Sequence, residues 1–116
     1  MGVTAIMKVE THCGVTVIIT EERLDSLVGP KLKDVVNDLT RSQGAHLVID
    51  MQKTLFIDSS GLGGLLSSLK SVIKKQGDIR IARPTPQALT LLRLTRLHRV
   101  FEIHDTLEDA IKPSCS

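Results

Sequence analysis

The chain has 116 residues and a formal net charge of +2; 41% of its residues are hydrophobic and 24% are charged. This length holds one domain with a real core, and no apolar run is long enough to cross a bilayer. The near-balanced charge and the two aromatic side chains, Phe56 and Phe101, argue against a nucleic-acid-binding protein, which needs basic surface and stacking rings. Because the first residues lack the basic start and apolar segment of a secretory signal, we expect a cytoplasmic protein.

The first half of the chain predicts a hairpin, a helix and a buried strand. Strands are expected over residues 3–10 and 15–20, joined by a loop that contains Gly14. A helical spacing of apolar residues follows over 28–39, with Pro30 in the first turn, where proline is tolerated, and Gly44 as the stop. Residues 46–51 form a continuous apolar run closing on Asp50, which is typical of a strand covered on both faces. We therefore expect this strand at the centre of the sheet.

The second half alternates helices and strands. A helix is expected over 59–76, ended by Gly77, with an apolar stripe made by Leu62, Leu65, Leu66, Leu69, Val72 and Ile73. A strand over 79–82, a helix over 86–96, a strand over 100–103 and a helix over 106–111 complete the chain. The order β-β-α-β-α-β-α-β-α predicts a mixed α/β domain with a mostly parallel sheet, an antiparallel hairpin at its edge and helices packed against it. Residues 113–116 are expected to be a flexible tail.

The segment Asp58-Ser59-Ser60-Gly61 is the strongest functional signal. Asp and Ser are good N-cap residues, so one interpretation is a purely structural start to the helix. However, Gly61, Gly63 and Gly64 each reduce helix stability by about 0.8–1 kcal/mol relative to Ala. Small residues in this turn allow another backbone to approach, as a docking surface or a kinase active site would require. The residues alone leave both interpretations open.

Patterns of nucleotide binding and catalysis are missing from the chain. No Gly-Lys dipeptide is present for a P-loop, and Leu66 stands where a dinucleotide fingerprint requires its third glycine. A nucleophilic serine would need a G-x-S-x-G elbow or a designated base, and neither is found. Asp50 and Asp58 are expected at the carboxyl edge of the sheet, but without further partners they are weak evidence of a site. The sequence predicts no catalytic residue, no metal site and no cofactor, and therefore not an enzyme.

Histidines and cysteines give no spacing typical of a base or of metal ligands. The histidines are dispersed, at His12, His46, His98 and His104. Cys13 and Cys115 lie far apart in the sequence and are expected to be free thiols.

A basic cluster lies near the predicted helix over 86–96. It consists of Arg93, Arg96, His98 and Arg99, and we interpret it as a solvated helix end rather than a binding site. One helix cannot bury all the neighbouring leucines against one sheet, so some apolar surface is expected to remain for a partner.

Residues 56–63, Phe-Ile-Asp-Ser-Ser-Gly-Leu-Gly, resemble the D-S-[ST]-G-[LIVM]-[GA] phosphorylation motif of STAS domain proteins, in particular the single-domain bacterial anti-sigma factor antagonists. Leu24-Asp25 and the run over residues 47–50 also match, and the similarity covers nearly the whole chain. The resemblance implies a STAS domain over residues 1–112. Lys53 and Thr54 stand where relatives often have small residues, and we expect them to tune the choice of partner.

The resemblance implies a partner-switching cycle. The unphosphorylated protein would bind an anti-sigma factor that is also a serine kinase of the histidine-kinase-like ATPase fold, and so release the sigma factor. The kinase would then phosphorylate Ser59 and end binding, and a PP2C-type phosphatase would restore the active form. Ser60 is a lower-ranked second acceptor. The implied partner-binding residues are Asp58, Ser60, Gly61, Leu62 and Gly63. No nucleic-acid or membrane partner is implied.

Two other functions remain open from the sequence. One is a STAS scaffold subunit of a signalling or transport complex that does not switch by phosphorylation. The other is a small hydrolase or transferase with Ser59 as nucleophile, which lacks a base and an orienting acid. The complete motif favours the phosphorylation switch.

Overall fold

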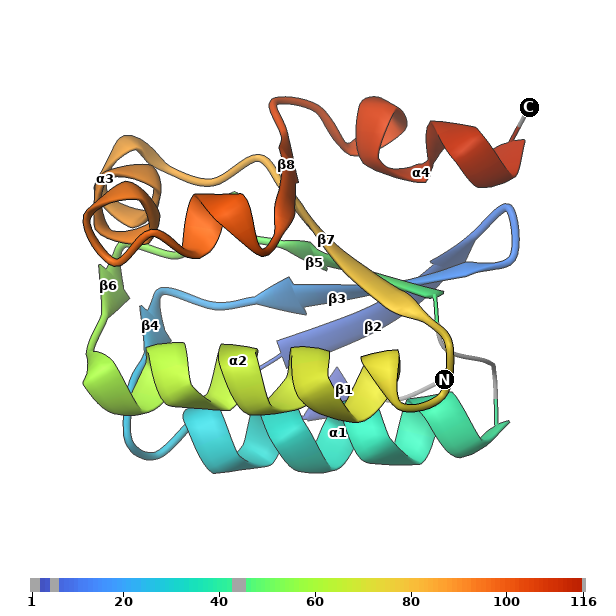
Figure 1. Ribbon diagram of the computed structural model, residues 1–116, viewed down its shortest axis with the longest axis horizontal. Coiled ribbons are helices and arrows are strands. Elements are labelled where there is room, and N and C mark those ends of the chain that lie inside the picture. The colour runs from blue at the N-terminus through green and yellow to red at the C-terminus, as the bar shows by residue number, and fades with distance from the viewer. Residues whose placement is uncertain (1–2, 5–6, 43–45, 116) are drawn as a thin grey trace.

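The computed structural model describes residues 3–4, 7–42 and 46–115. Within these ranges the strands form a main sheet in the order β1-β2-β3-β5-β7-β8 and a small second sheet of β4 and β6 (Figure 1). The strands of the main sheet are β1 Val3–Thr4, β2 Met7–His12, β3 Val15–Thr20, β5 His46–Asp50, β7 Asp78–Ala82 and β8 Glu102–His104. Those of the small sheet are β4 Arg23–Leu24 and β6 Phe56–Ile57.

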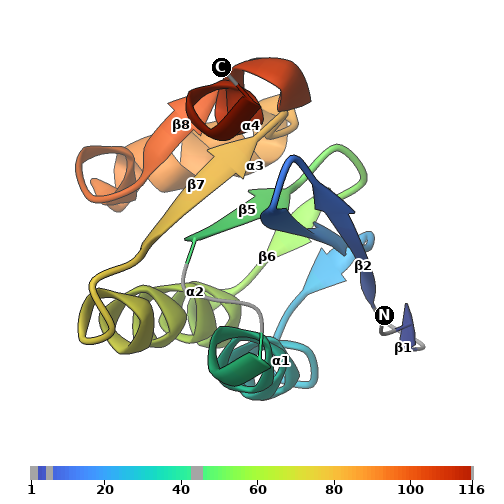
Figure 2. The same cartoon turned by 90° about the vertical axis from the view of Figure 1, so that its right-hand side faces the viewer.

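Helices cover both faces of the main sheet. They are α1 Gly29–Ser42, α2 Ser59–Ile73, α3 Pro86–Leu94, the 3-10 helix η1 Leu97–Arg99, and α4 Leu107–Cys115. Figure 2 shows α1 and α2 side by side beneath the sheet and α4 on its other side. In the described ranges, no helix combines the length and the apolar character that crossing a membrane requires.

The antiparallel hairpin predicted at this end of the sheet is present as β2 and β3. The edge strand itself is β1, which pairs antiparallel with β2, so the strand predicted over residues 3–10 is represented by β1 and the first part of β2. β2 pairs with β3 in a register that joins His12 to Val15, so the turn is Cys13-Gly14. Both turn residues have positive φ, 54° and 80°, which matches the twist that a two-residue hairpin loop needs. Cys13 is disulfide-bonded, so the expectation of a free thiol at this position is wrong.

β5 is the central strand that its apolar sequence predicted. It pairs in parallel with β3 on one side and with β7 on the other. Leu47 and Ile49 belong to the larger core cluster, together with residues of α1, α2 and α3. Val48 points to the opposite face and packs with Ala110 and Ile111 of α4. Burial on both faces explains why this strand shows no polar alternation.

Several helix and strand boundaries in the second half of the chain differ from the predicted ones. α3 ends at Leu94, and Arg96 adopts φ 62°, which begins the 3-10 turn η1 and moves the last strand to Glu102–His104. α4 continues to Cys115, through residues expected to form a tail, whereas Ser116 lies outside the described residues. Gly44, the predicted stop of α1, also lies outside them.

The apolar stripe of α2 is narrower than predicted. Ile73 is 56% exposed, whereas Ser68 is fully buried and donates its hydroxyl to the Gly64 carbonyl, at 2.8 Å. Ile73 lies on the side of α2 that faces away from the core, whereas its neighbour Val72 is fully buried. Ser68 satisfies its polar group within its own helix.

Candidate functional site

Asp58 is the N-cap of α2. Its backbone is extended, with φ −104° and ψ −177°, and its side chain accepts a hydrogen bond from the Gly61 amide at 2.9 Å. This geometry confirms the capping interpretation for Asp58. Ser59 and Ser60 follow as the first two helical residues, and both are exposed. The motif therefore has a structural aspartate followed by two accessible hydroxyls.

Backbone hydrogen bonds join the segment that leads into α2 to the segment that precedes α1. Phe56 donates its amide to the Glu22 carbonyl at 3.1 Å, and Asp58 donates its amide to the Leu24 carbonyl at 3.3 Å. β4 and β6 pair in parallel between these bonds. The short sheet, which the sequence did not predict, thus fixes where α2 begins and which way its first turn faces.

Two of the three glycines in the first turns of α2, Gly61 and Gly64, are required by packing inside the chain. A Cβ on Gly61 would lie 2.0 Å from the Leu24 carbonyl oxygen, and one on Gly64 would lie 2.7 Å from the Gly29 carbonyl oxygen. Gly61 is buried, so it does not face a partner, and Leu62 packs partly into the core. Gly63 differs, because a Cβ there would meet nothing within 4 Å. Of the three, Gly63 alone opens onto a free surface.

Asp25, from the matching Leu24-Asp25 pair, organises the neighbouring loop. Its carboxylate accepts hydrogen bonds from the amides of Leu27 and Val28, at 3.1 and 3.3 Å, and from Arg23 Nε at 3.2 Å. Burial acts to raise the pKa of Asp25, but the hydrogen bonds from Arg23 and the two amides outweigh it, so the pKa is lowered. Arg23 also lies over the Phe56 ring, 4.2 Å from its centroid.

Asp50, the last residue of β5, has a different role from Asp58, which follows β6. The Asp50 side chain is 1% exposed and pairs with Arg83 through both carboxylate oxygens. It also accepts a hydrogen bond from the Gln52 amide at 3.1 Å. The hydrogen bond to Asp50 raises the pKa of Arg83 despite partial burial. This pair ties the loop after β5 to the turn after β7.

Hydrogen bonds of three threonine hydroxyls further connect these loops. Thr54 bonds with Thr20 at 2.7 Å and donates to the Glu21 carbonyl at 2.8 Å, while Thr85, the N-cap of α3, donates to the Thr54 carbonyl at 2.5 Å. Thr54 is fully buried, so it holds the loop inside the protein, whereas Lys53 is exposed. Sequence reasoning missed this network, since isolated threonines carry no pattern that distinguishes a buried hydroxyl from a solvated one.

Three of the four histidines form hydrogen bonds with carboxylates outside the motif. Hydrogen bonds to carboxylates join His12 to Glu10, His46 to Asp78 and His104 to Glu102, at 3.0, 2.6 and 2.8 Å. In the part of the chain that the structure describes, no group of three or more His, Cys, Asp or Glu side chains is arranged to hold a metal ion. None of these three hydrogen bonds involves Ser59.

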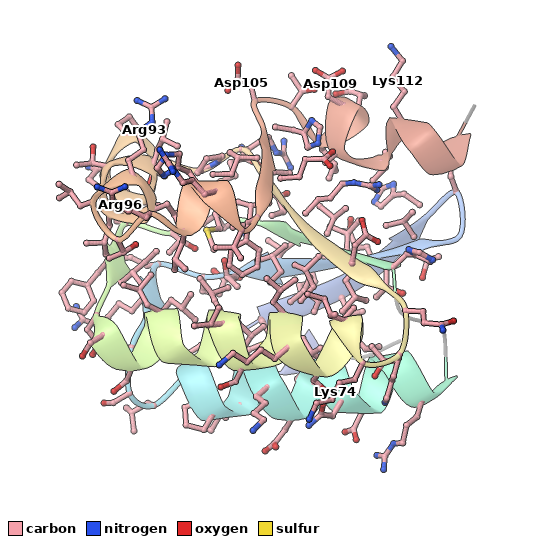
Figure 3. All side chains as sticks on the ribbon, in the orientation of Figure 1. Lys74, Arg93, Arg96, Asp105, Asp109 and Lys112 are labelled. Carbon is pink, nitrogen blue, oxygen red and sulfur yellow. The ribbon has the colours of Figure 1, made fainter. Side chains whose placement is uncertain are left out.

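The basic residues of the α3 region lie on another side of the molecule. Figure 3 shows Arg93 and Arg96 at the α3 end, apart from the α1 and α2 layer. Arg93, Arg96, His98 and Arg99 are all exposed, consistent with a solvated helix end. Leu94 is 75% exposed, whereas the other leucines of α3 are partly or fully buried, so α3 leaves one exposed leucine and not a continuous apolar surface.

The fold and the motif define a mixed α/β domain with an accessible serine at a capped helix start. The STAS domain family matches residues 7–110, and the chain therefore belongs to that family.

Individual relatives carry regulatory names. The chain is 26% identical over 106 residues to an anti-sigma F factor antagonist of Paenibacillus polymyxa, covering 90% of this chain and 91% of the relative. It superposes on an anti-sigma factor antagonist of Mycobacterium paratuberculosis with a TM-score of 0.82 and 26% identity, covering 95% and 93% of the two chains. A sulfate transporter family protein of Wolinella succinogenes shares the fold, with a TM-score of 0.78, 16% identity and coverage of 88% and 85%.

Proposed function

We propose that this protein is an anti-sigma factor antagonist that is switched off by phosphorylation of Ser59. In its unphosphorylated form it binds an anti-sigma factor that is also a serine kinase of the histidine-kinase-like ATPase fold, and the sigma factor is released. A PP2C-type phosphatase reverses the modification. The relatives' name describes a binding activity and not a reaction, so the role is that of a regulator and not an enzyme. We place it in the cytoplasm, where its target acts on transcription.

The exposed hydroxyl of Ser59, directly after the Asp58 cap, is the observation that carries the proposal. The carboxylate of Asp58 is committed to the Gly61 amide, so Ser59 is free to be a phosphate acceptor. Around it, Ser60 and Gly63 present little side-chain bulk, and Leu27 and Phe56 are 74% and 41% exposed on the neighbouring segments. We assign partner contact to these outward-facing groups and exclude Gly61, which is buried.

Electrostatics explain how one phosphate ends binding. The group brings a charge of about −1.5 to −2 next to the Asp58 carboxylate. A helix N-terminus tolerates an anion, but a close interface would have to desolvate the phosphate and Asp58 together. Weakening a complex a hundredfold requires about 2.7 kcal/mol, which one such dianion supplies without refolding.

A titration with the anti-sigma factor kinase of the same organism tests the proposal. Ser59→Ala should bind as tightly as the wild type and resist inactivation by ATP, and Ser59→Glu should bind about tenfold more weakly, or about 1.4 kcal/mol. Ser60→Ala is the matched control for the modification, because it removes the neighbouring hydroxyl and should leave phosphorylation of Ser59 normal. Equal affinity of Ser59→Glu and the wild type would refute the switch. If Ser59 also stayed unmodified in cells while the protein ran in a stable complex, the scaffold alternative would replace it.

A further inference from the structure

A groove runs between α1 and α2 and begins beside the motif. Its first part is lined by Ser60, Gly63 and Gly64 of α2 and by Gly29 and Lys33 of α1, among others. Its second part shares Lys33 and continues along α2, where the lining comprises Lys33, Ser67, Lys70, Ser71 and Lys74. The two parts form one surface feature that follows the helix pair, whose parallel course is visible in Figure 1.

The shape of the groove follows from the small residues in the two helices. α1 and α2 approach closely where Gly64 faces Gly29, leaving no room there for side chains. The α2 residues that line the groove are glycine, serine or lysine. Ser71, which lines the groove, donates its hydroxyl to Asn37 Oδ1 of α1 at 2.7 Å and so links the two helices.

All charged side chains that line the groove are positive. Its lining includes Lys33, Lys70 and Lys74, all exposed, and contains no carboxylate. In the described part of the chain, the ion pairs involve other residues, and none includes these three lysines. α2 itself carries no acidic residue. Neighbouring like charges without counter-charges raise the local positive potential and attract an acidic partner.

We propose that this groove is a second docking surface, which receives an acidic polypeptide segment of the partner that recognises Ser59. The inference rests on the proposed function for the identity of that partner, because the groove opens at Ser60 and Gly63. Positive charges placed along a linear groove are complementary to the negative charges of an acidic peptide. The lining has no aromatic ring and no arginine, the groups that a single-stranded nucleic acid uses for stacking.

The length of the groove sets the probe. α2 has 15 residues, which corresponds to about 22 Å of helix. An extended peptide rises about 3.3 Å per residue, so about seven or eight residues cover that length. The probe is therefore a capped peptide of about eight residues with alternating Glu and Ala, and its matched control replaces each Glu by Gln.

Amide chemical shifts of the full chain, titrated with these peptides, test the groove. We expect the Glu peptide to shift the amides of Gly63, Gly64, Ser67 and Ser71, and the Gln peptide to leave them unchanged. Raising the ionic strength from about 0.01 M to about 1 M shortens the Debye length from about 30 Å to about 3 Å and should abolish the shifts. Binding of both peptides alike would overturn the proposal.

Charge reversal localises the effect. Lys70→Glu with Lys74→Glu should weaken binding of the Glu peptide about tenfold, and Lys70→Gln with Lys74→Gln should weaken it less. The control is Arg93→Glu with Arg96→Glu, which changes the same charge at the α3 end, far from Lys74 in Figure 3. An equal loss in the control, or tighter binding of an oligouridine than of the peptide, would overturn the proposal. Because neither kinase nor phosphate takes part, a negative result leaves the Ser59 switch standing.

Discussion

The first two turns of α2 have an inner side and an outer side that serve different purposes. On the inner side, Gly61 and Gly64 press against the backbone of Leu24 and Gly29, where any side chain would collide. On the outer side, Ser59, Ser60 and Gly63 are exposed. The same run of small residues thus satisfies the fold on one side and leaves the other free for a partner. Small size by itself does not tell which purpose a residue serves.

Gly61→Ala should disrupt the packing of α2 against β4 on the inner side. The added methyl would lie 2.0 Å from a backbone oxygen, which cannot swing away as a side chain does, so α2 and β4 must separate. We expect a loss of about 3 kcal/mol in the free energy of unfolding, measured by urea denaturation. A loss below about 0.5 kcal/mol would show that the inner contact is not required.

Asp50→Ala should destabilise the protein without touching the outer side. It leaves Arg83 partly buried and unpaired and removes the acceptor of the Gln52 amide. Since Arg83 retains some access to water, we expect the free energy of unfolding to fall by about 2 kcal/mol, again measured by urea denaturation. Asp58→Ala is the comparison, because it removes one half-buried helix cap and should cost about 1 kcal/mol. Equal losses in the two variants would remove the distinction between the aspartates.

Gly63→Ala should stabilise the protein, in contrast to Gly61→Ala. Its Cβ enters open space, and alanine is favoured over glycine in a helix by about 0.8 kcal/mol, so the free energy of unfolding should rise. Affinity for the anti-sigma factor kinase should fall if the partner's backbone approaches here. A stabilised variant with unchanged affinity would place the partner elsewhere on the outer side.

The smallest expected effect is the pH dependence of the stability that Asp25 contributes. Because the pKa of Asp25 is lowered in the folded state, its ionised form stabilises the fold above the ordinary value of 3.8, and this contribution is lost as the pH falls through the lowered pKa. Asp25→Asn keeps an oxygen for the two amides but removes the charge paired with Arg23. The variant should be slightly less stable than the wild type near neutral pH, and the difference should vanish in acid. A difference that grows in acid would contradict the lowered pKa.

Sequence reasoning located the motif but could not separate its members by role. Asp58 as a cap follows from its residue type and its position before a helical pattern, and the structure confirms it. The burial of Gly61 depends on β4, a two-residue strand too short to leave a pattern in the sequence. The pairing of Asp50 with Arg83 joins residues 33 positions apart, and that partner is set by the β5 and β7 register.

The sequence by itself determined the order of the main elements, the central place of the strand over residues 46–50, the antiparallel hairpin and the serine that follows a capping aspartate. These follow from local periodicity and residue preference, which act over one element at a time. Only the tertiary structure decided which glycines are packed, which hydroxyls are buried and where lysines from two helices line one groove. Those properties depend on how closely separate elements approach, and no single element encodes that distance.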